Sequence, residues 1–515
     1  MRVLIFHGYL LRGTGSNVYN ANLAQALARL GHDVHLLCQD LGAGSLPWVD
    51  AVGRWESGEL QVEPGEGADH PGSVTAYLPD IAGLLPVYVA DAYEGFEAKT
   101  FPKLSEGELE RYLARNVAAV RDVEERIGGS QAALANHLIA GPAILARAGL
   151  RFAAKIHGSA LSYTVKPNPR FLPLAREGME AAEVVLVGSR HTATDLWEAL
   201  DDPALPAKTR LGPPGVDVEA FSPLEDRSAA PAELEALASQ LEASVPRTGS
   251  GLGRDEGAAA AALRRYAAAE GPRVIFVGKL IVSKGCDLLL AAWPLVVAAN
   301  PGARLLLVGF GEYREGLERL WRAISSGDLE DAREVARLGW ALEGGEEAPL
   351  AFLASFLAAP PAGYDEASRS AAGSVELAGR LEYGELAHAV RASDALVVPS
   401  TFPEAFGMVA AEAAAAGALP LCARHSGLAE VAGALAGELP REIGELTSFG
   451  LGPGAIAEIA ARLNRWLALP EAERAAARRT LAAAARSRWS WEGVARSVLA
   501  ASAGDLDRLE RVPSG

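Results

Sequence analysis

The chain has 515 residues, of which half are hydrophobic, and carries a net charge of −17 from 65 acidic and 48 basic residues. This length is too great for one hydrophobic core, so two or three domains are expected. The acidic balance argues against nonspecific nucleic-acid binding, which depends on basic surface, and against broad adhesion to an anionic membrane.

The three cysteines and the first residues of the chain predict the cellular compartment of the protein. Cys38, Cys286 and Cys422 lie far apart without a CxxC pair, so no zinc site or disulfide framework is indicated. A strand-like run begins directly at Met1 rather than a signal peptide, and no apolar run reaches transmembrane length. We therefore expect a reduced cytoplasmic protein with no integral membrane segment.

The first part of the chain alternates strand and helix patterns. A short apolar run at 3–6 predicts a buried strand, and the apolar spacing over 17–30 predicts a helix that Gly31 ends. This order is typical of a parallel sheet in an α/β protein. Further strand-like runs, which extend the first domain to residue 212, lie at 34–38, 132–135, 152–156 and 184–187.

Three features of this first domain are candidate binding residues. Backbone N–H groups at Gly13 and Gly15, in the loop before the first helix, can face a diphosphate. A dinucleotide-binding fingerprint would instead need glycine at position 18, which is Val18. Tyr88 and Tyr93 supply aromatic rings that can stack on a sugar, although a packed surface loop is the plainer interpretation.

The second part of the chain predicts a linker, another β/α domain and a final helix. Gly-Pro-Pro-Gly at 212–215 opens a linker over 213–270, with a flexible insert whose run at 245–253 is rich in Gly, Ser and Pro. A second series of strands defines a domain over 271–488, in which 323–372 is a helical insert. The strands are predicted at 273–277, 304–308, 375–377 and 395–398. Residues 489–515 form the final helical segment.

Lys279 and Lys284 follow the first strand of this second domain. Two cations at the carboxyl end of a strand can stabilise the charge that grows on a diphosphate leaving group. The alternative is that both are solvated lysines in a turn. We find no DxD motif with neighbouring carboxylates that suits a metal–diphosphate site, so we expect the lysines to replace a metal ion.

The segment Pro-Glu-Ala-Phe-Gly from 403, which continues into an alanine-rich run, places two carboxylates around a helix start. Glu404 should lie in the loop before the helix, and Glu412 about one and a half turns inside it. The helix N-terminus suits a phosphate, and a carboxylate accepts two hydrogen bonds from vicinal hydroxyls. A nucleotide-sugar has this layout, whereas the alternative is two glutamates on a solvated helix.

These motifs and others, in this order, resemble the GT-B glycosyltransferases of the large retaining family, family 4 or group 1, that includes sucrose-phosphate synthase. The resemblance implies two Rossmann-like β/α/β domains facing a central cleft, with the C-terminal helix crossing back to the first. The Glu-x7-Glu pair is Glu404 and Glu412. The other matching segments are Gly13-Thr14-Gly15, 31–37, His157-Gly158, 187–196, 213–223, 277–285, 305–312 and 490–495.

The resemblance implies a retaining transfer of a hexose from a nucleoside-diphosphate-sugar to a hydroxyl acceptor, without a cofactor or metal. Glu412 would bind the ribose, Lys279 and Lys284 the diphosphate, and Glu404 the sugar, with His157 near the hexose. Lys279 departs from the family, where arginine is common. Residues whose backbone would meet the donor are Gly13, Gly15, Arg380, Leu381, Phe406, Gly407, Met408 and Val409.

The acceptor side is expected in the first domain. His137, Tyr88 and Tyr93 are its candidates, and the acceptor would be a small molecule, a glycan or a lipid-linked hydroxyl compound. Two other functions fit the same architecture, namely a non-catalytic nucleotide-sugar-binding subunit and a sugar-nucleotide epimerase. A lone histidine such as His157 is also commonly a structural residue.

Overall fold

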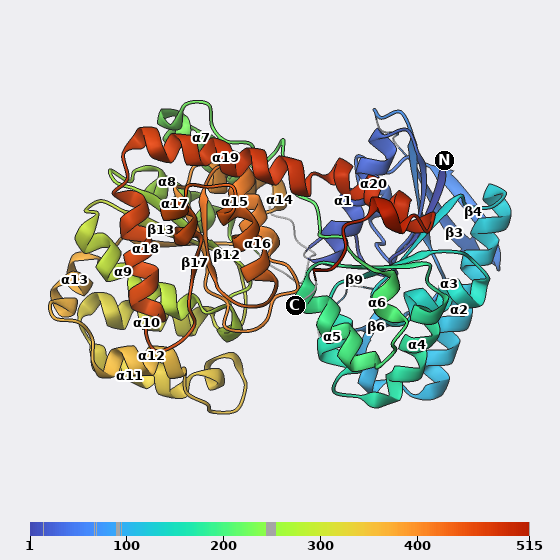
Figure 1. Cartoon of the computed structure of the whole chain (residues 1–515), viewed down its shortest axis with the longest axis horizontal. Helices are drawn as coiled ribbons and strands as arrows, with labels where there is room; N and C mark the ends of the chain where they lie inside the picture. Colours follow the sequence, from blue (N-terminus) through green and yellow to red (C-terminus); the bar gives the residue numbers. More distant parts are fainter. Residues whose placement is uncertain are drawn as a thin grey trace. The chain divides into compact units, whose positions relative to one another are not determined.

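The computed structural model describes residues 1–13, 15–65, 67, 69–88, 93, 95–243 and 254–513. The chain folds into two compact units, Met1–Gly215 with Trp489–Gly515, and Val216–Arg488. Each unit contains a mainly parallel sheet with helices on its faces (Figure 1). The expected pair of Rossmann-like domains is therefore confirmed. The predicted flexible run at 245–253 lies outside the described residues.

The sheet of unit 1 has the strand order β11-β10-β9-β8-β1-β2-β5-β3-β4, and only β3 and β4 pair antiparallel. Its central strands are apolar throughout because helices cover both faces of a parallel sheet. The strands are β1 (Arg2–Phe6), β2 (Asp33–Leu37), β3 (Ala51–Glu56), β4 (Glu59–Pro64), β5 (Ser73–Leu78), β8 (Ala132–Asn136), β9 (Ala153–Ile156), β10 (Val184–Val187) and β11 (Thr209–Leu211). A separate parallel pair is β6 (Leu84–Val87) with β7 (Glu97–Thr100).

The last helix of the chain belongs to unit 1. Helix α20 (Trp491–Ser502) packs on α1 (Ser16–Arg29), and its Trp491, Val494 and Val498 join the apolar cluster that buries Leu23. The chain thus returns to its first unit, as the resemblance implies. The other helices of this unit are α2 (Glu106–Ile127), α3 (Gly141–Ala148), α4 (Leu172–Ala181), α5 (Arg190–Leu200) and α6 (Leu205–Lys208).

The sheet of unit 2 is parallel, with the order β14-β13-β12-β15-β16-β17. All strands therefore end at one edge, which is where open α/β sheets bind ligands. The strands are β12 (Arg273–Val277), β13 (Arg304–Val308), β14 (Val375–Gly379), β15 (Ala395–Val398), β16 (Leu419–Ala423) and β17 (Ser448–Phe449). The helices beside them are α9 (Cys286–Ala299), α14 (Tyr383–Arg391), α15 (Met408–Ala415), α16 (Ser426–Ala436), α17 (Arg441–Gly444), α18 (Ala455–Leu467) and α19 (Glu471–Trp489).

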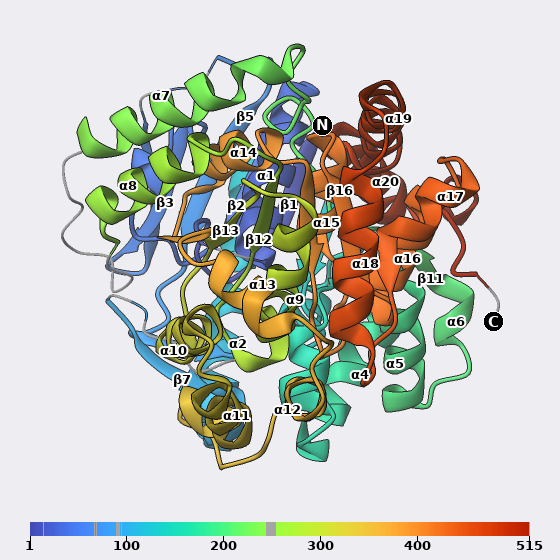
Figure 2. The same ribbon diagram turned by 90° about the vertical axis from the view of Figure 1, so that its left-hand side faces the viewer.

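Two helices occupy much of the segment 213–270. The composition of this segment predicts a linker with a flexible insert, so the structure differs from that prediction. Helices α7 (Ala230–Ala243) and α8 (Glu256–Ala267) lie side by side (Figure 2) and belong to unit 2. Their apolar faces bury Leu234, Leu241 and Leu263, which is the helical spacing that stabilises such a pair. The glycine and proline signals around them concealed this periodicity.

The segment 323–372 is built from short helices. Helix α10 (Arg314–Ser326) is followed by α11 (Leu329–Leu338), α12 (Ala351–Ala358) and α13 (Tyr364–Ser370). Helix α13 packs on α9, and the Tyr364 hydroxyl donates to the Ala291 carbonyl over 2.7 Å. Over the described ranges of the two units, no helix is both long and apolar enough to cross a membrane.

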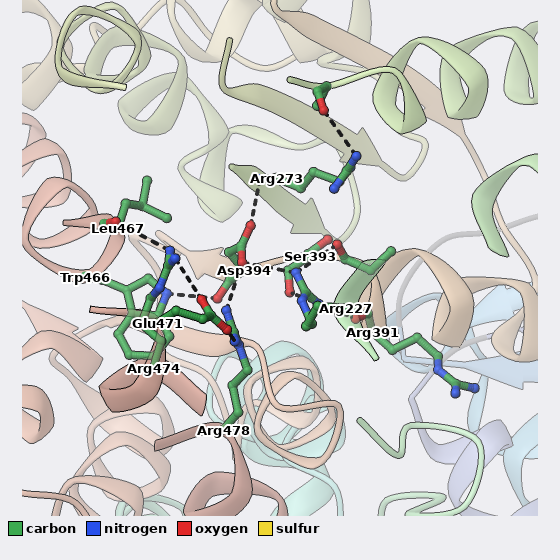
Figure 3. Close-up of polar contacts among 12 residues, drawn as sticks. Arg227, Arg273, Arg391, Ser393, Asp394, Trp466, Leu467, Glu471, Arg474 and Arg478 are labelled. Atoms are coloured by element: carbon green, nitrogen blue, oxygen red, sulfur yellow. Dashed lines mark hydrogen bonds and ion pairs between the residues drawn. The ribbon is translucent and has the colours of Figure 1, made fainter. Parts of the chain in front are cut away.

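A buried carboxylate, Asp394, joins several elements of unit 2 at the start of β15. Figure 3 shows the guanidinium groups of Arg227 and Arg478 pointing toward it, with nitrogen–oxygen distances of 3.0 and 3.1 Å. Its other oxygen accepts the backbone N–H of Arg273 over 2.9 Å, and its carbonyl accepts from Trp466 Nε1 over 3.0 Å. This one side chain therefore ties the start of the α7 segment and α19 to the sheet.

Candidate functional site

The predicted site residues fall into two groups, one in each unit. Unit 2 carries Lys279, Lys284, Arg380, Leu381, Glu404, Phe406, Gly407, Met408, Val409 and Glu412. Unit 1 carries Gly13, Gly15, Tyr88, Tyr93, His137 and His157.

In unit 2, Lys284 and Glu404 form a direct ion pair, although 120 positions separate them in sequence. The contact arises because β12 and β15 are neighbours in the sheet, so the loops at their carboxyl ends meet. The two loops are joined by the Thr401 N–H, which donates to the Ser283 carbonyl over 2.9 Å. A cation and a carboxylate, both partly exposed, thus stand together at the edge where ligands bind.

Two glycines make this arrangement possible. Gly285 has φ +65°, and a Cβ there would lie 2.1 Å from the Pro399 carbonyl oxygen, so only glycine lets the two loops approach. Gly407 has φ +108°, and its Cβ would lie 2.5 Å from a methyl carbon of Leu428. Gly407 directly precedes α15 and so brings bare backbone to the start of that helix.

A ring of hydrogen bonds fixes Glu404. The Ser400 hydroxyl donates to Glu404 Oε1 over 2.8 Å, and the Glu404 N–H donates to Ser426 Oγ over 2.9 Å. His425 Nε2 donates to the Ser400 carbonyl over 2.7 Å, which leaves His425 Nδ1 to accept from Ser426 Oγ over 3.1 Å. The sequence patterns did not single out Ser400, His425 or Ser426.

The loop that carries the two lysines is held from the helical insert. Lys279 follows β12 by two residues and, within the described part of the chain, makes no hydrogen bond or ion pair. Between the lysines, the Val282 N–H donates to Glu343 Oε2 over 2.6 Å. The helical insert therefore positions the Lys279–Lys284 loop. The sequence of the insert did not predict this contact.

Glu412 lies inside α15 and is only 4% exposed. This burial raises the pKa of the Glu412 carboxyl to about 7, and the nearby Tyr383 hydroxyl partly offsets the rise. Tyr383 is the first residue of α14, which follows the Arg380–Leu381 loop. A carboxyl poised near neutrality can accept hydroxyl donors when it is ionised.

The loop after β14 borders a small pocket of about 200 Å³. The Arg380 guanidinium lies 5.9 Å from the centre of the Phe310 ring and 3.0 Å from Glu382, while Leu381 is buried. The lining consists of Arg254, Asp255, Ala258, Phe310, Arg314, Leu377, Ala378, Gly379 and Arg380. A flat ring, three guanidinium groups and strand-end backbone are suited to an aromatic base with oxygen acceptors.

In unit 1, His157 and His137 end neighbouring strands, with ring centres 5.0 Å apart. His157 is partly exposed and its Nε2 lies 2.8 Å from Asn136 Oδ1. His137 is buried in a left-handed conformation, φ 69°, and neither ring nitrogen has a hydrogen-bond partner among the described residues. Such strain and an unpaired polar group are found at functional sites.

The other candidates of unit 1 lie close to this pair or at the first loop. Tyr88 is buried, donates its hydroxyl to the Ile139 carbonyl over 3.0 Å and has its ring centre 4.7 Å from that of His137. Tyr93 is partly buried against the same apolar cluster. Gly15 is the N-cap of α1 and Gly13 precedes it, whereas Thr14 and residues 89–92 lie outside the described residues.

A metal site is not evident in the described ranges, where no group of three or more His, Cys, Asp or Glu side chains is placed to hold an ion. All three cysteines are buried thiols.

The comparisons with known proteins point to one family. Models described as glycosyl transferases group 1 match residues 271–354 and 367–486, both in unit 2. The GDP-mannose-dependent alpha-(1-6)-phosphatidylinositol monomannoside mannosyltransferase of Mycobacterium tuberculosis is 28% identical over 48% of this chain and 55% of its own length. The D-inositol 3-phosphate glycosyltransferase of Segniliparus rotundus is 31% identical over 57% of this chain and 46% of its own. The chain thus spans about half the length of the curated relatives it matches.

Solved structures share the fold across nearly the whole chain. Sucrose-phosphate synthase from Thermosynechococcus elongatus has a TM-score of 0.53 at 17% identity and covers 99% of this chain and 98% of its own. Anabaena Alr3699/HepE, in complex with UDP and glucose, has a TM-score of 0.55 at 16% identity and covers 99% of this chain and 100% of its own. At these identities the likeness concerns the fold.

Proposed function

We propose that the chain is a glycosyltransferase of the group 1 type with a GT-B fold, and that it transfers a hexose from a nucleoside-diphosphate-sugar to a hydroxyl acceptor with retention of configuration. One observation carries the proposal. The Lys284–Glu404 pair lies at the adjoining ends of β12 and β15 and just before the N-terminus of α15. A diphosphate and a sugar are recognised by cations, N–H groups and a carboxylate.

Each group of unit 2 has a task in this reaction. Lys279 and Lys284 stabilise the charge that grows on the diphosphate as the glycosidic bond breaks. Free N–H groups at the start of α15, at Gly407, Met408 and Val409, face the same end of the donor. Glu404 accepts hydrogen bonds from sugar hydroxyls and Glu412 accepts them from the ribose.

The base is assigned to the end of β14, where Arg380, Leu381 and Phe310 border the pocket. The acceptor is assigned to unit 1, near His137, Tyr88 and Tyr93, with His157 beside the hexose, and Gly13 and Gly15 provide backbone to the diphosphate. These assignments extend the family pattern to the residues that match it. We infer a cytoplasmic location, which the three free and buried cysteines support.

The experiment that tests the proposal starts from the donor. The named relatives include a GDP-mannose-dependent enzyme, and a structural neighbour was solved with UDP. We therefore expect one of the UDP-, GDP- or ADP-sugars to raise the melting temperature, because a ligand that binds the folded state stabilises it. The same sugar should then be released or transferred with formation of the free nucleoside diphosphate, and absence of turnover would contradict the assignment as an enzyme.

Glu412→Gln should weaken donor binding more than it slows the chemical step. A ribose contact is similar in the ground and transition states, so its loss raises KM and leaves kcat nearly unchanged. Because the pKa of Glu412 is about 7, the wild-type KM for the donor should fall as the pH rises through 7 and the carboxyl ionises. The variant should lose this trend, since glutamine does not ionise, whereas a collapse of kcat with unchanged KM would place Glu412 at the reacting centre.

Transfer should continue in excess EDTA and should preserve the anomeric configuration of the donor. The lysines at 279 and 284 would supply the charge that Mg²⁺ or Mn²⁺ otherwise brings to a diphosphate. Retention is what the resemblance to the retaining family implies, through Glu404 and Glu412. NMR of the anomeric proton of the product, with and without chelator, measures both the metal dependence and the configuration. Activity that is lost in chelator and restored by added metal would contradict metal-independent transfer. An inverted anomer would contradict retention.

A further inference from the structure

A chain of five polar side chains runs through unit 1 from the first loop to His157. Asn17 donates to the Arg12 carbonyl over 2.9 Å and its Oδ1 lies 3.1 Å from His7 Nε2. The chain continues through Asn20, whose Nδ2 lies 3.0 Å from His7 Nδ1, and Asn136, whose Nδ2 lies 2.8 Å from Asn20 Oδ1. Asn136 Oδ1 then lies 2.8 Å from His157 Nε2.

Backbone carbonyls fix the direction of every hydrogen bond in this chain. A carbonyl only accepts, so the Asn20 nitrogen, 2.8 Å from the Ser16 carbonyl, must be the donor. The Asn136 nitrogen, 3.2 Å from the Phe6 carbonyl, must be a donor as well. The oxygen of Asn136 consequently faces His157, and the His157 Nε2 atom must carry the proton that it donates.

The tautomer of His157 follows from this orientation. With its proton on Nε2, a neutral imidazole keeps a bare lone pair on Nδ1. Nδ1 of His157 accepts no hydrogen bond from any described residue, and it is not among the enclosed, unpaired atoms of those residues. The ring therefore presents an acceptor to whatever binds beside it.

The surroundings keep this ring neutral. Burial lowers the pKa of His157 well below its usual value, and the nearby His137, Lys155 and His7 lower it further. Lys155 lies on β9, His137 and His7 follow β8 and β1, and the Tyr19 ring of α1 contacts the imidazole at 5.0 Å between centres. No carboxylate of the described residues pairs with His157, so nothing there favours the imidazolium.

We propose that Asn20 and Asn136 are positioning residues that hold His157 with its proton on Nε2, so that Nδ1 accepts a hydrogen bond from a hydroxyl of the bound hexose. This inference rests on the proposed function for the place of the hexose, but the tautomer rests on unit 1 alone. The Nδ1 lone pair can bind only a group that donates a hydrogen bond. The subsite is therefore built for a sugar hydroxyl and disfavours a carboxylate or phosphate oxygen, which only accepts.

The tautomer is tested in the free protein by the ¹⁵N chemical shifts of the imidazole nitrogens after selective histidine labelling. The His157 signals are assigned by their loss in His157→Asn. We expect a neutral ring with the proton on Nε2 at neutral pH. A proton on Nδ1, or an imidazolium, would overturn the inference, and this measurement does not depend on activity.

The ligand is tested by titrating the labelled protein with UDP-glucose and GDP-mannose, each against UDP or GDP alone. We expect the Nδ1 signal to shift with the sugar nucleotide that binds and not with the bare nucleoside diphosphate. Binding of a sugar nucleotide that leaves Nδ1 unchanged would overturn the hydroxyl contact while leaving the proposed function intact. A shift without transfer would instead count against the proposed function and support the contact.

Asn136→Asp separates positioning from simple structural support. An aspartate there would pair with the ring and raise the pKa of His157, so the imidazolium would lose the Nδ1 lone pair. We expect turnover at neutral pH to fall about tenfold or more, which one lost hydrogen bond to the bound hexose can explain, and to recover as the pH rises. The matched control is Asn116→Asp, a buried asparagine of α2 whose Nδ2 donates to the Tyr112 carbonyl. A loss in Asn136→Asp that is the same at every pH, or an equal pH-dependent loss in the control, would overturn the inference.

Discussion

Lys284→Ala should lower turnover at saturating donor by about a hundredfold or more, which is what removal of one preorganised stabilising group typically costs. The ammonium is held next to Glu404 by the close approach of two loops, and Gly285 permits that approach. Its charge is therefore in place before the leaving diphosphate develops its own. Because the interaction strengthens in the transition state, the loss should appear in kcat more than in KM.

Two variants control this experiment. Lys103→Ala removes an exposed lysine of unit 1 that is none of the predicted site residues, and it should leave turnover unchanged. Glu404→Gln with Lys284→Ala shows how much of the loss arises from a carboxylate left without its cation, since coupled residues are not additive. A folded Lys284→Ala protein that keeps near-normal turnover would contradict the role of Lys284 at the diphosphate.

The meeting of Lys284 and Glu404 could be anticipated from the order of motifs along the chain. Each follows an apolar strand pattern, and parallel strands end at one edge of their sheet, so any two such loops are candidates for contact. The short motifs also predicted that the helix begins near Gly407 and that Glu412 lies inside it, because glycine and an alanine run have strong local preferences. Local patterns of this kind are what a sequence displays most directly.

The residues that support these side chains could not be found in the same way. Glu343 reaches the lysine loop from a helical insert 61 positions away, and Asn136 meets Asn20 across 116 positions. Such bridges depend on where two elements pack, which no local periodicity records. The available signal was weak, namely an asparagine at the end of an otherwise apolar strand, where an unpaired amide would be costly.

At helices α7 and α8 a local pattern was present but the prediction from sequence was wrong. Their apolar spacing was present at Leu234, Leu237 and Leu241, but the surrounding proline and glycine residues favoured a flexible linker. Tertiary packing of the two helices, together with Arg227 on Asp394, orders the segment. The glycine and proline residues therefore correctly predicted where elements end, but the described segments α7 and α8 between them are helical rather than flexible.

Asp394→Ala should destabilise unit 2 by about 3–5 kcal/mol, because it removes the buried carboxylate that Arg227 and Arg478 share, and the other carboxylate paired with Arg478, Glu471, is exposed. Arg478 is 8% exposed at its side chain and Arg227 is 24% exposed, so water replaces the lost carboxylate poorly. The backbone N–H of Arg273 also loses its acceptor at the sheet edge. The same change frees α19 and the start of the α7 segment from β15, so the effect should spread through the unit.

Hydrogen–deuterium exchange measures this effect without assuming that the whole chain unfolds in one step. Peptides from β12 and β15 should lose protection in Asp394→Ala, whereas β8 of unit 1 serves as an internal reference. Glu438→Ala, which breaks the exposed pair with Arg488, should change protection by less than about 1 kcal/mol. Removing Arg227 together with Asp394 should restore part of the loss, because the Arg227 guanidinium would otherwise lack its carboxylate, whereas Arg478 keeps its ion pair with Glu471. Equal protection of β15 in Asp394→Ala and Glu438→Ala would show that the buried ion pairs contribute no more than surface pairs do.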